Sequence, residues 1–369
     1  MARPRHIAVV TAGGDCPGMN AALRAVVRAA VHRHQIRVTG FLDGFEGLLS
    51  DRSRELGFDD VSGIVAQGGT MLGASNRDDP FRVPIDRLGD RAYEDRSDVV
   101  LRTLARHGIE GLLVIGGDGS LTIGRRLEAR GVTVVGIPKT IDNDVHGTDV
   151  SLGFDSALTV ATEAVDRLHT TAASHHRVMV VEVVGRNAGW IALEAGLAGG
   201  GDVILIPGIP FRYEAVAAGI LDRARRGRRF SIVVVAEGVS CPGGGPVVRQ
   251  IVGDSPEPVR LGGVGLVLAH ALEGLVPFEV RYVVLGHVQR GGAPTPFDRI
   301  LATRFGAAAV AALADGESGR MVALRGTRIE RVPLADALSR PHRVDPQGER
   351  VAAARGIGTI FGDETGTEA

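Results

Sequence analysis

Two short runs of glycine and acidic residues have types and spacings that suit phosphate chemistry. The first, residues 116–120 (GGDGS), contains glycines that let phosphate oxygens approach the backbone closely. A helix that starts at this point favours negative charge, so the run is typical of an anion cradle. Asp118 is repulsive beside phosphates unless Mg²⁺ lies between them. The run therefore predicts a phosphate site in which Asp118 holds magnesium, with Gly117, Gly119 and Ser120 along the phosphates.

The second run, residues 138–144 (PKTIDND), places two carboxylates around Asn143. A carboxylate held near a sugar hydroxyl takes its proton while a phosphoryl group is transferred. The alternative is structural, because Asp and Asn are common in turns and caps. Either run alone is as typical of a turn as of a site. Two such runs after neighbouring strands favour chemistry, with Thr140, Asp142 and Asp144 as candidate catalytic residues.

The elements around these runs predict a parallel sheet. Residues 112–115 and 132–137 read as buried strands, and residues 121–130 have helical composition. Ser120 is the expected N-cap of that helix, and Gly131 is expected to end it. Two strands joined through a helix form a βαβ unit with parallel strands. Because such sheets bind ligands at the carboxyl ends of their strands, both runs fall where a site is expected.

Two further glycine turns lie nearer the N-terminus. Residues 13–20 (GGDCPGMN) separate a predicted strand from a predicted helix, as a phosphate cradle would. Close packing of a helix on a strand also requires glycine, so this turn alone is weak evidence. Residues 68–77 (GGTMLGASNR) form another glycine-rich loop. It ends in Arg77, which is either an anion contact or an ordinary surface arginine.

The remaining chain alternates strands and helices throughout, which predicts an α/β fold. Arg177 and Arg186 flank one predicted strand and are too far apart to meet through it. Residues 285–299 (LGHVQRGGAPTPFDR) gather histidine, glutamine and arginine among glycines and prolines, which a purely structural loop rarely needs. We expect three irregular segments: a surface excursion at 78–98, a flexible loop at 241–258 and a frayed tail at 362–369.

Length and composition bound the class of protein. The 369 residues suggest two domains, and 44% apolar with 23% charged residues is ordinary for a soluble globular protein. A net charge of −1 gives no bulk attraction to nucleic acid or membrane, so local arginines must hold any anionic ligand. Two cysteines provide neither a disulfide framework nor a metal cluster. Without an apolar run of membrane length or a signal peptide, a cytoplasmic enzyme is expected.

The order of these motifs resembles that of the 6-phosphofructokinases. GGDCPGMN, GGDGS, PKTIDND, SHHR, VVGRNAGW, AEG and LGHVQRGG follow one another as in that family, over about the first nine-tenths of the chain. GGDG alone also occurs in the related NAD and diacylglycerol kinases, whereas the set with PKTIDND is highly specific. The resemblance implies two Rossmann-like lobes with the active site in the cleft between them. It implies a donor lobe of residues 1–150 plus about 289–340, and a sugar-phosphate lobe of 151–288 plus the C-terminal segment.

The resemblance also implies phosphorylation of fructose 6-phosphate at its 1-hydroxyl, a step of glycolysis. Asp142 would be the general base, with Thr140, Asp144 and Arg186 beside the reacting group. The donor and its Mg²⁺ would be bound by Gly13, Arg77, Gly117, Asp118, Gly119 and Ser120. The sugar phosphate would be bound by Thr140, Asp142, Arg177, Val184, Gly185, Arg186, Glu237, Arg281, His287 and Arg290. Because Arg177 and Arg281 come from a neighbouring subunit in the family, a homo-oligomer, usually a tetramer, is implied.

Two residues point to different phosphoryl donors. In the family, glycine at the position of Gly119 leaves room for ATP, whereas pyrophosphate users often have aspartate there. Lysine at the position of Lys139 is typical of pyrophosphate enzymes, whereas the best-known bacterial ATP enzymes have glycine. We give Gly119 more weight, because a steric block is decisive for a bulky donor. We therefore expect ATP, with pyrophosphate as the alternative, in a sequence of the actinobacterial type.

Two departures from the family pattern and two rival functions remain. The loop before Arg77 is one residue longer than the family's usual LGSSR-like pattern. Four arginines match the family's effector pocket, but His169 stands where arginine is usual; the four are Arg24, Arg28, Arg226 and Arg228.

One rival function is a kinase for another sugar phosphate, such as sedoheptulose 7-phosphate. The other is a sugar-phosphate sensor without turnover, which Asp118 and Asp142 disfavour because carboxylates do not help passive phosphate binding.

Overall fold

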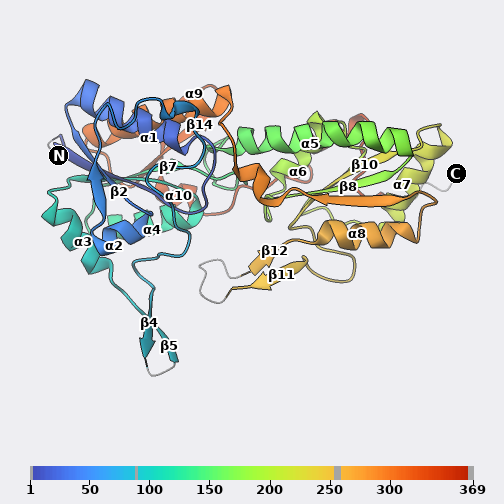
Figure 1. Cartoon of the computed structure of the whole chain (residues 1–369), viewed down its shortest axis with the longest axis horizontal. Helices are drawn as coiled ribbons and strands as arrows, with labels where there is room; N and C mark the ends of the chain where they lie inside the picture. The colour runs from blue at the N-terminus through green and yellow to red at the C-terminus, as the bar shows by residue number, and fades with distance from the viewer. Residues whose placement is uncertain (1–2, 88–89, 253–258, 365–369) are drawn as a thin grey trace. The chain divides into compact units, whose positions relative to one another are not determined.

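The computed structural model describes residues 3–87, 90–252 and 259–364 and divides them into two compact units. Unit 1 takes its described residues from 3–156 and 290–342. Unit 2 takes its described residues from 157–252, 259–289 and 343–364. Each unit is built around its own sheet, and Figure 1 labels many of the elements of both units. The α/β fold class with mainly parallel strands is thereby confirmed.

Unit 1 contains a seven-stranded sheet in the order β15-β14-β7-β6-β1-β2-β3. Pairing is parallel from β14 to β2 and antiparallel at both edges. The central strands β1, β6 and β7 are buried along their whole length and are mostly apolar, because both faces of the sheet are covered. The strand bounds are β1 His6–Thr11, β2 Arg37–Phe41, β3 Ser53–Glu55, β6 Gly111–Gly116, β7 Val134–Pro138, β14 Arg320–Arg325 and β15 Arg328–Pro333.

Helices pack on both faces of this sheet. On one face α1 (Met19–Arg28) and α9 (Pro296–Ala314) share a core that includes Val26 and Phe305. Gly306 lets these two helices approach closely, because a Cβ there would lie 2.7 Å from the Cβ of Ala25. The other face is covered by α2 (Phe45–Ser50), α3 (Ser97–Arg106), α4 (Asp118–Glu128) and α10 (Leu334–Ala337). The remaining helices of unit 1 are η1 (Ala29–His34) and η2 (Ile64–Ala66).

Unit 2 contains a four-stranded, entirely parallel sheet in the order β13-β8-β10-β9. The strand bounds are β8 Val178–Val183, β9 Val203–Leu205, β10 Ser231–Ala236 and β13 Val280–Val284. The helix bounds are α5 Phe154–His175, α6 Trp190–Ala198, α7 Tyr213–Arg225, α8 Val264–Glu273, η3 Gly286–Arg290 and α11 Glu349–Gly356. The N-terminal residues of α5 belong to unit 1. Strands β8 and β10 are fully buried, whereas most of the edge strand β13 is exposed.

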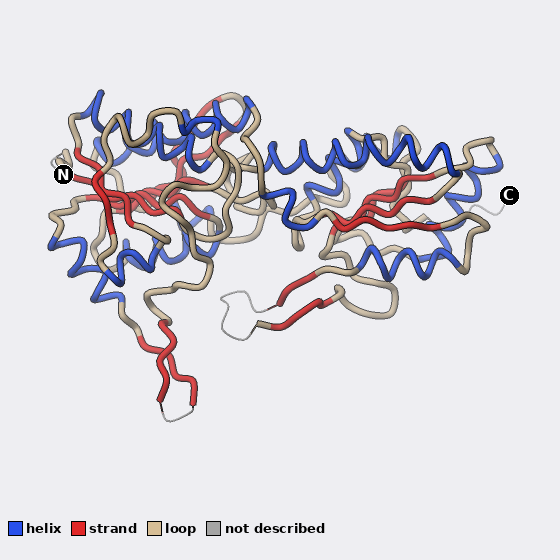
Figure 2. The backbone as a smooth tube through the Cα atoms, in the orientation of Figure 1, coloured by secondary structure: helices blue, strands red, loops and turns tan. Residues whose placement is uncertain are grey.

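Two segments that we expected to be irregular form antiparallel hairpins instead (Figure 2). Strands β4 (Val83–Arg87) and β5 (Asp90–Glu94) pair in the first, and β11 (Val248–Ile251) and β12 (Val259–Leu261) in the second. The prediction was wrong because prolines and charges marked these segments as loops, yet cross-strand pairing satisfies their backbone groups. Residues 88–89 of the expected surface excursion and residues 253–258 of the expected flexible loop lie outside the described residues.

The frayed tail was predicted to begin at residue 362, but residues 362–364 are held by hydrogen bonds and an ion pair. Backbone N–H groups of Phe361 and Gly362 donate to the carboxylate of Glu364, at 2.9 and 2.8 Å. Arg355 forms an ion pair with Asp363 at 2.7 Å. These contacts hold the chain through residue 364, and residues 365–369 of the predicted tail lie outside the described part.

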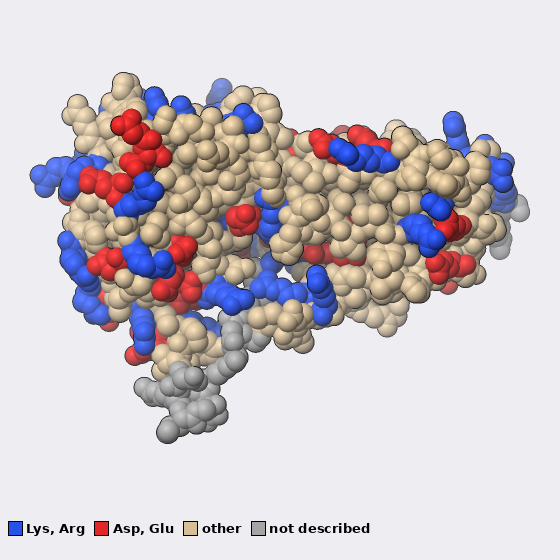
Figure 3. Space-filling view, viewed as in Figure 1, with Lys and Arg blue, Asp and Glu red and all other residues tan. Residues whose placement is uncertain are grey.

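The distribution of charged side chains on the surface agrees with the nearly equal numbers of basic and acidic residues in the sequence, 42 and 43. Acidic and basic side chains are interspersed over most of the face shown in Figure 3. Among the described helices, none is both long and apolar enough to cross a membrane.

Candidate active site

The GGDGS run joins β6 to α4, at the carboxyl end of a central strand. Helix α4 begins at Asp118, with Gly117 before it, so the expected N-cap at Ser120 is one turn too late. Ser120 is buried instead, and its side chain packs so closely on Gly116 that a Cβ there would collide with it. The first N–H groups of a helix have no partner within it and favour anions. Asp118 stands exposed at this helix start.

The space beside Gly119 is open. A Cβ added at this glycine would have no heavy atom within 4 Å, among the described residues. Gly119 also has no positive φ, so its backbone conformation suits other residue types. The absence of a side chain here therefore serves neither packing nor backbone geometry. It leaves room for a ligand at the start of α4.

The turns after β1, β6 and β7 meet around Lys139. A Cβ at Gly13 would lie 3.2 Å from Ser120 Oγ and 3.3 Å from Lys139 Nζ. Lys139 Nζ donates a hydrogen bond to the backbone carbonyl of Gly14, and the residue is only 3% exposed. Burial lowers the pKa of this ammonium group from its usual range. Three segments separated in sequence thus form one cluster with a cation in it.

The carboxylate of Asp144 lies close enough to Asp118 to affect it. The pKa of Asp118 is raised, first because nearby protein groups displace part of its hydration although the residue is exposed, and second because the charge of Asp144 is near. Two neighbouring carboxylates suit a hard divalent cation such as Mg²⁺, which binds oxygen ligands. The described residues contain no group of three or more His, Cys, Asp or Glu that would hold a metal ion. Magnesium normally takes one or two carboxylates together with water and phosphate oxygens, so this pair fits it.

The turn that carries Asp142 is fixed by hydrogen bonds. Asp142 is 4% exposed, and its backbone N–H donates to Thr140 Oγ1 at 3.1 Å. Asn143 has a φ of 53°, in the left-handed region that asparagine tolerates. Its side chain accepts a hydrogen bond from the N–H of Ser151 at 2.8 Å and donates to the carbonyl of Asp149 at 3.1 Å. The structure therefore holds the acidic side chains on a well-supported loop.

Arg290 and Arg77 belong to unit 1 as well. Arg290 Nη1 donates to the carbonyl of Asp15 at 3.1 Å, and its guanidinium group packs on Gly14. The loop that ends in Arg77 is tied to the first glycine turn, because the N–H of Gly13 donates to the carbonyl of Ser75 at 2.9 Å. Both arginines thus lie on segments that contact the cluster around Lys139.

In unit 2, Glu237 forms a second cluster with the turn after β8. Its Oε1 accepts a hydrogen bond from the N–H of Arg186 at 3.1 Å. Burial raises the pKa of Glu237, while hydrogen bonds from the N–H groups of Arg186 and Gly185 oppose the shift. Gly185 and Arg186 both have positive φ, at 130° and 48°. Val184 precedes this turn and is half-buried.

Arg177 and Arg281 lie away from that cluster, near the amino ends of β8 and β13. Both pair with Glu279. His287 is exposed in η3, which follows the carboxyl end of β13, and Glu237 follows the carboxyl end of the parallel strand β10. A six-residue strand spans about 20 Å at about 3.3 Å per residue. Within one chain, the two arginines and the Glu237 cluster therefore do not meet.

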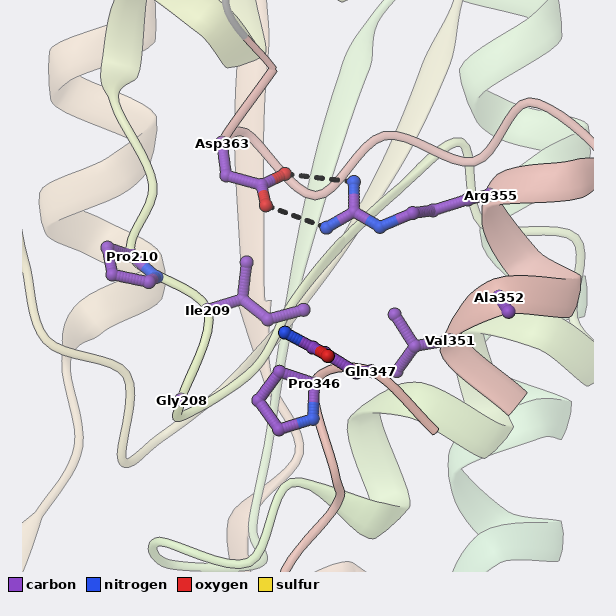
Figure 4. A pocket seen from close by; sticks show the side chains of 9 residues that line it. All are labelled: Gly208, Ile209, Pro210, Pro346, Gln347, Val351, Ala352, Arg355 and Asp363. Atoms are coloured by element: carbon purple, nitrogen blue, oxygen red, sulfur yellow. Dashed lines mark hydrogen bonds and ion pairs between the residues drawn. The ribbon is translucent and has the colours of Figure 1, made fainter. Parts of the chain in front are cut away.

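A cavity of about 380 Å³ in unit 2 is separate from both clusters (Figure 4). It lies among Ile209, Val351 and Arg355, whose guanidinium group forms two hydrogen bonds with Asp363 at 3.0 and 2.7 Å. None of the residues that line it is a site residue predicted from the sequence.

Sequence reasoning missed the residues that support the Asp142 turn. Asn143 was noted only as a turn residue, yet its side chain closes the loop onto Ser151. The asparagine between two aspartates was the available signal. His342 also contacts this turn, 199 residues later in the chain. No feature of the sequence near His342 indicates that contact.

Glycine turns, paired carboxylates and parallel sheets define an α/β phosphotransferase. A family model described as phosphofructokinase matches residues 6–313, and the chain belongs to the phosphofructokinase family.

Curated relatives carry the names of both donor types. The chain is 48% identical to "ATP-dependent 6-phosphofructokinase 2" of Clostridium perfringens over 361 residues, covering 97% of this chain and 99% of the relative. It is 49% identical to "Pyrophosphate--fructose 6-phosphate 1-phosphotransferase" of Amycolatopsis methanolica over 342 residues, covering 93% and 97%. Among solved structures, Pichia pastoris phosphofructokinase in the T-state matches with a TM-score of 0.78 and 33% identity. That match covers 97% of this chain and 37% of the longer Pichia chain.

Proposed function

We propose that this protein transfers a phosphoryl group from ATP to the 1-hydroxyl of fructose 6-phosphate, giving fructose 1,6-bisphosphate in glycolysis. The observation that carries the proposal is the placement of Asp118, Asp142 and Asp144 after neighbouring parallel strands, beside glycine turns. Acidic groups at a site for anions are explained when one side chain accepts a proton and others hold a cation. The names of the relatives agree with this reaction.

In this proposal unit 1 binds the donor and activates the acceptor. Mg²⁺, when bound, offsets the negative charge of the donor phosphates, and Asp118 and Asp144 would hold it. Gly13, Gly117, Gly119 and Ser120 line the donor phosphates, with Arg77 from the adjoining loop. Asp142 is the general base that takes the proton of the 1-hydroxyl, and Thr140 lies beside it. Positioning and charge compensation account for most of the rate enhancement in such a reaction.

Unit 2 binds the sugar phosphate. Glu237 binds sugar hydroxyls, and Val184, Gly185 and Arg186 lie near the reacting end of the sugar. His287 contacts the phosphate end, and Arg290, which belongs to unit 1, is assigned to the same phosphate. We assign these roles from the family motifs, and the hydrogen bond from the N–H of Arg186 to Glu237 supports the assignment because one ligand can contact both residues.

Arg177 and Arg281 act in the site of a neighbouring copy, so the active form is a homo-oligomer, which we propose to be a tetramer. About one strand length separates them from Glu237, so they do not contact the ligand that Glu237 binds in the same chain. They contribute to phosphate binding by reaching the ligand of another chain. The edge strand β13 supports this view. Tyr282 and Val284 on it are 45% and 49% exposed, although they are apolar, and an edge strand offers unpaired backbone groups to a partner.

ATP is the proposed donor because the open space at Gly119 accommodates a bulky group. Pyrophosphate is the second candidate, favoured by the position of Lys139 next to Gly13 and Gly14. Sequence identity does not separate the two, since relatives of both names match at 48% and 49%. We also propose a cytoplasmic location, where ATP and sugar phosphates are found.

A product assay tests the proposal. Purified protein is incubated with Mg²⁺, fructose 6-phosphate and either ATP or pyrophosphate, and fructose 1,6-bisphosphate is measured. We expect product with ATP. Product with pyrophosphate alone would overturn the donor assignment, and no product with either donor would overturn the function. Parallel reactions with sedoheptulose 7-phosphate measure activity on other sugar phosphates.

A further inference from the structure

The segment at Pro341 and His342 contacts the turn that carries Asp142 and Asp144. The backbone N–H of His342 donates to the carbonyl of Asp144 at 2.7 Å. The ring Nδ1 of His342 lies 2.9 Å from the carbonyl oxygen of Asn143. Pro341 forms an isolated antiparallel bridge with Val145. These contacts join two consecutive residues of this segment to three consecutive residues of the turn.

The chemistry of the Nδ1 contact defines the protonation of the ring. A carbonyl oxygen only accepts hydrogen bonds, so Nδ1 must carry a hydrogen. This hydrogen is present in the Nδ1–H tautomer of the neutral ring and in the charged imidazolium. The contact consequently survives protonation of His342. A side chain without a donor at this place would leave the Asn143 carbonyl without this hydrogen bond.

The contacts of His342 complement those of Asn143. The Asn143 side chain binds Ser151 and Asp149, while His342 binds the main-chain carbonyls of Asn143 and Asp144. Asn143 also has the left-handed φ of 53°, a conformation that persists only where surrounding contacts hold it. With one set of contacts removed, we expect this peptide to rotate and to move the side chains on both sides of Asn143.

We infer that His342 is a positioning residue for the general base Asp142 and for Asp144. It touches neither substrate; it fixes the turn that carries both carboxylates. The inference rests on the proposed function, since it assigns a consequence for phosphoryl transfer. A displacement of about 1 Å in a reacting group costs about 10²-fold in rate. Loss of the ring contact is therefore expected to lower turnover more than it changes binding.

Steady-state kinetics of two variants test the inference. His342→Phe keeps a ring but removes the donor, whereas His342→Asn places an amide N–H near the position of Nδ1. We expect kcat to fall about 10–100-fold in His342→Phe, with KM for both substrates changed less than about threefold. We expect His342→Asn to recover most of kcat. His270→Phe, at an exposed histidine on α8, is the matched control and should retain kcat.

A merely structural role would give a different result. In that case His342→Phe and His342→Asn would lose activity together with thermal stability, without a split between kcat and KM. That pattern, or an unchanged kcat in His342→Phe, would overturn the inference. Should His342→Phe fail to fold, kinetics of His342→Asn and the spectroscopic measurement below still decide it.

Nitrogen NMR of the full-length protein with labelled histidine gives a readout without activity. The His342 signals are assigned by their loss in His342→Asn. We expect an Nδ1 that is protonated, and an unprotonated Nδ1 would refute the hydrogen bond to Asn143. If the wild-type protein makes no fructose 1,6-bisphosphate, the proposed function fails, and the catalytic part of this inference fails with it. If the wild type is active and the His342 variants behave normally, only this inference fails.

Discussion

The ammonium group of Lys139 donates to the backbone carbonyl of Gly14, so the residue after β7 reaches the turn after β1. This hydrogen bond places a buried cation beside Gly13 and Ser120, where donor phosphates are proposed to bind. The same cluster contains the open space at Gly119. Lys139 supplies charge, which either donor tolerates, whereas Gly119 supplies room, which only the larger donor needs. The donor question is therefore best tested at Gly119.

Replacing Gly119 by aspartate should weaken the use of ATP at least about tenfold, because the new side chain fills the space proposed for the donor and repels its phosphates. The fold should be unaffected, since a Cβ there meets no heavy atom within 4 Å. Kinetics with ATP and with pyrophosphate measure the effect. Gly245→Asp introduces the same side chain into open space in unit 2 and serves as the control. Undiminished ATP turnover in Gly119→Asp would remove the steric argument.

Replacing Asp142 by asparagine should lower kcat by about 10²–10⁴-fold, because a general base is lost while the size of the side chain is kept. KM for both substrates should change little, since the turn keeps the bond between the Asp142 N–H and Thr140. Asp149→Asn, at an exposed position in the same loop, is the control and should retain activity. Unchanged turnover in Asp142→Asn would refute the assignment of the base.

Mixed oligomers test whether Arg281 acts in the site of another copy. Arg281→Ala and Asp142→Asn should each be nearly inactive alone. When both chains are produced together, some sites combine an intact Asp142 from one chain with an intact Arg281 from another. We expect such mixtures to recover a measurable share of wild-type turnover. Recovery is measured against a mixture of separately purified variants, and its absence in a confirmed mixed oligomer would contradict shared sites.

The buried carboxyl group of Asp298 should make the stability of the protein depend on pH. Its oxygens accept hydrogen bonds from the N–H of Gly153 at 3.0 Å and from the N–H and hydroxyl of Ser156, at 2.8 and 2.6 Å. Burial nevertheless raises its pKa from 3.8 to about 6. The folded state therefore binds this proton more tightly than the unfolded state. The stabilisation is complete below about pH 3.8 and is lost as pH rises through about 6.

Asp298→Asn removes this titration while it keeps an oxygen acceptor. Relative to the variant, the wild type should lose free energy of unfolding on the order of 2–3 kcal/mol between pH 4 and pH 7, by proton linkage. Denaturant unfolding at several pH values measures the difference. Parallel pH profiles for the two proteins would show that Asp298 does not titrate in this range.

The sequence alone determined the class of fold and the places where glycine and acidic residues follow strands. Apolar runs such as Leu112 to Ile115 and the glycines after them depend on local periodicity, so β6, α4 and β7 could be predicted with small errors at their ends. Local patterns were also misleading where pairing decides the outcome, as in the hairpins of β4 with β5 and β11 with β12.

Only the tertiary structure decided which distant residues touch. Lys139 reaches Gly14 across 125 residues, and His342 reaches Asn143 across 199 residues. Asp118 and Asp144 come close because β6 and β7 are neighbours in the sheet, and the charge of Asp144 adds to the effect of burial in raising the pKa of Asp118. A side chain's type is visible in the sequence, but its partner depends on how strands and helices pack. The chemistry of the individual residues was therefore readable from the sequence, whereas their support and their mutual charge effects depended on the fold.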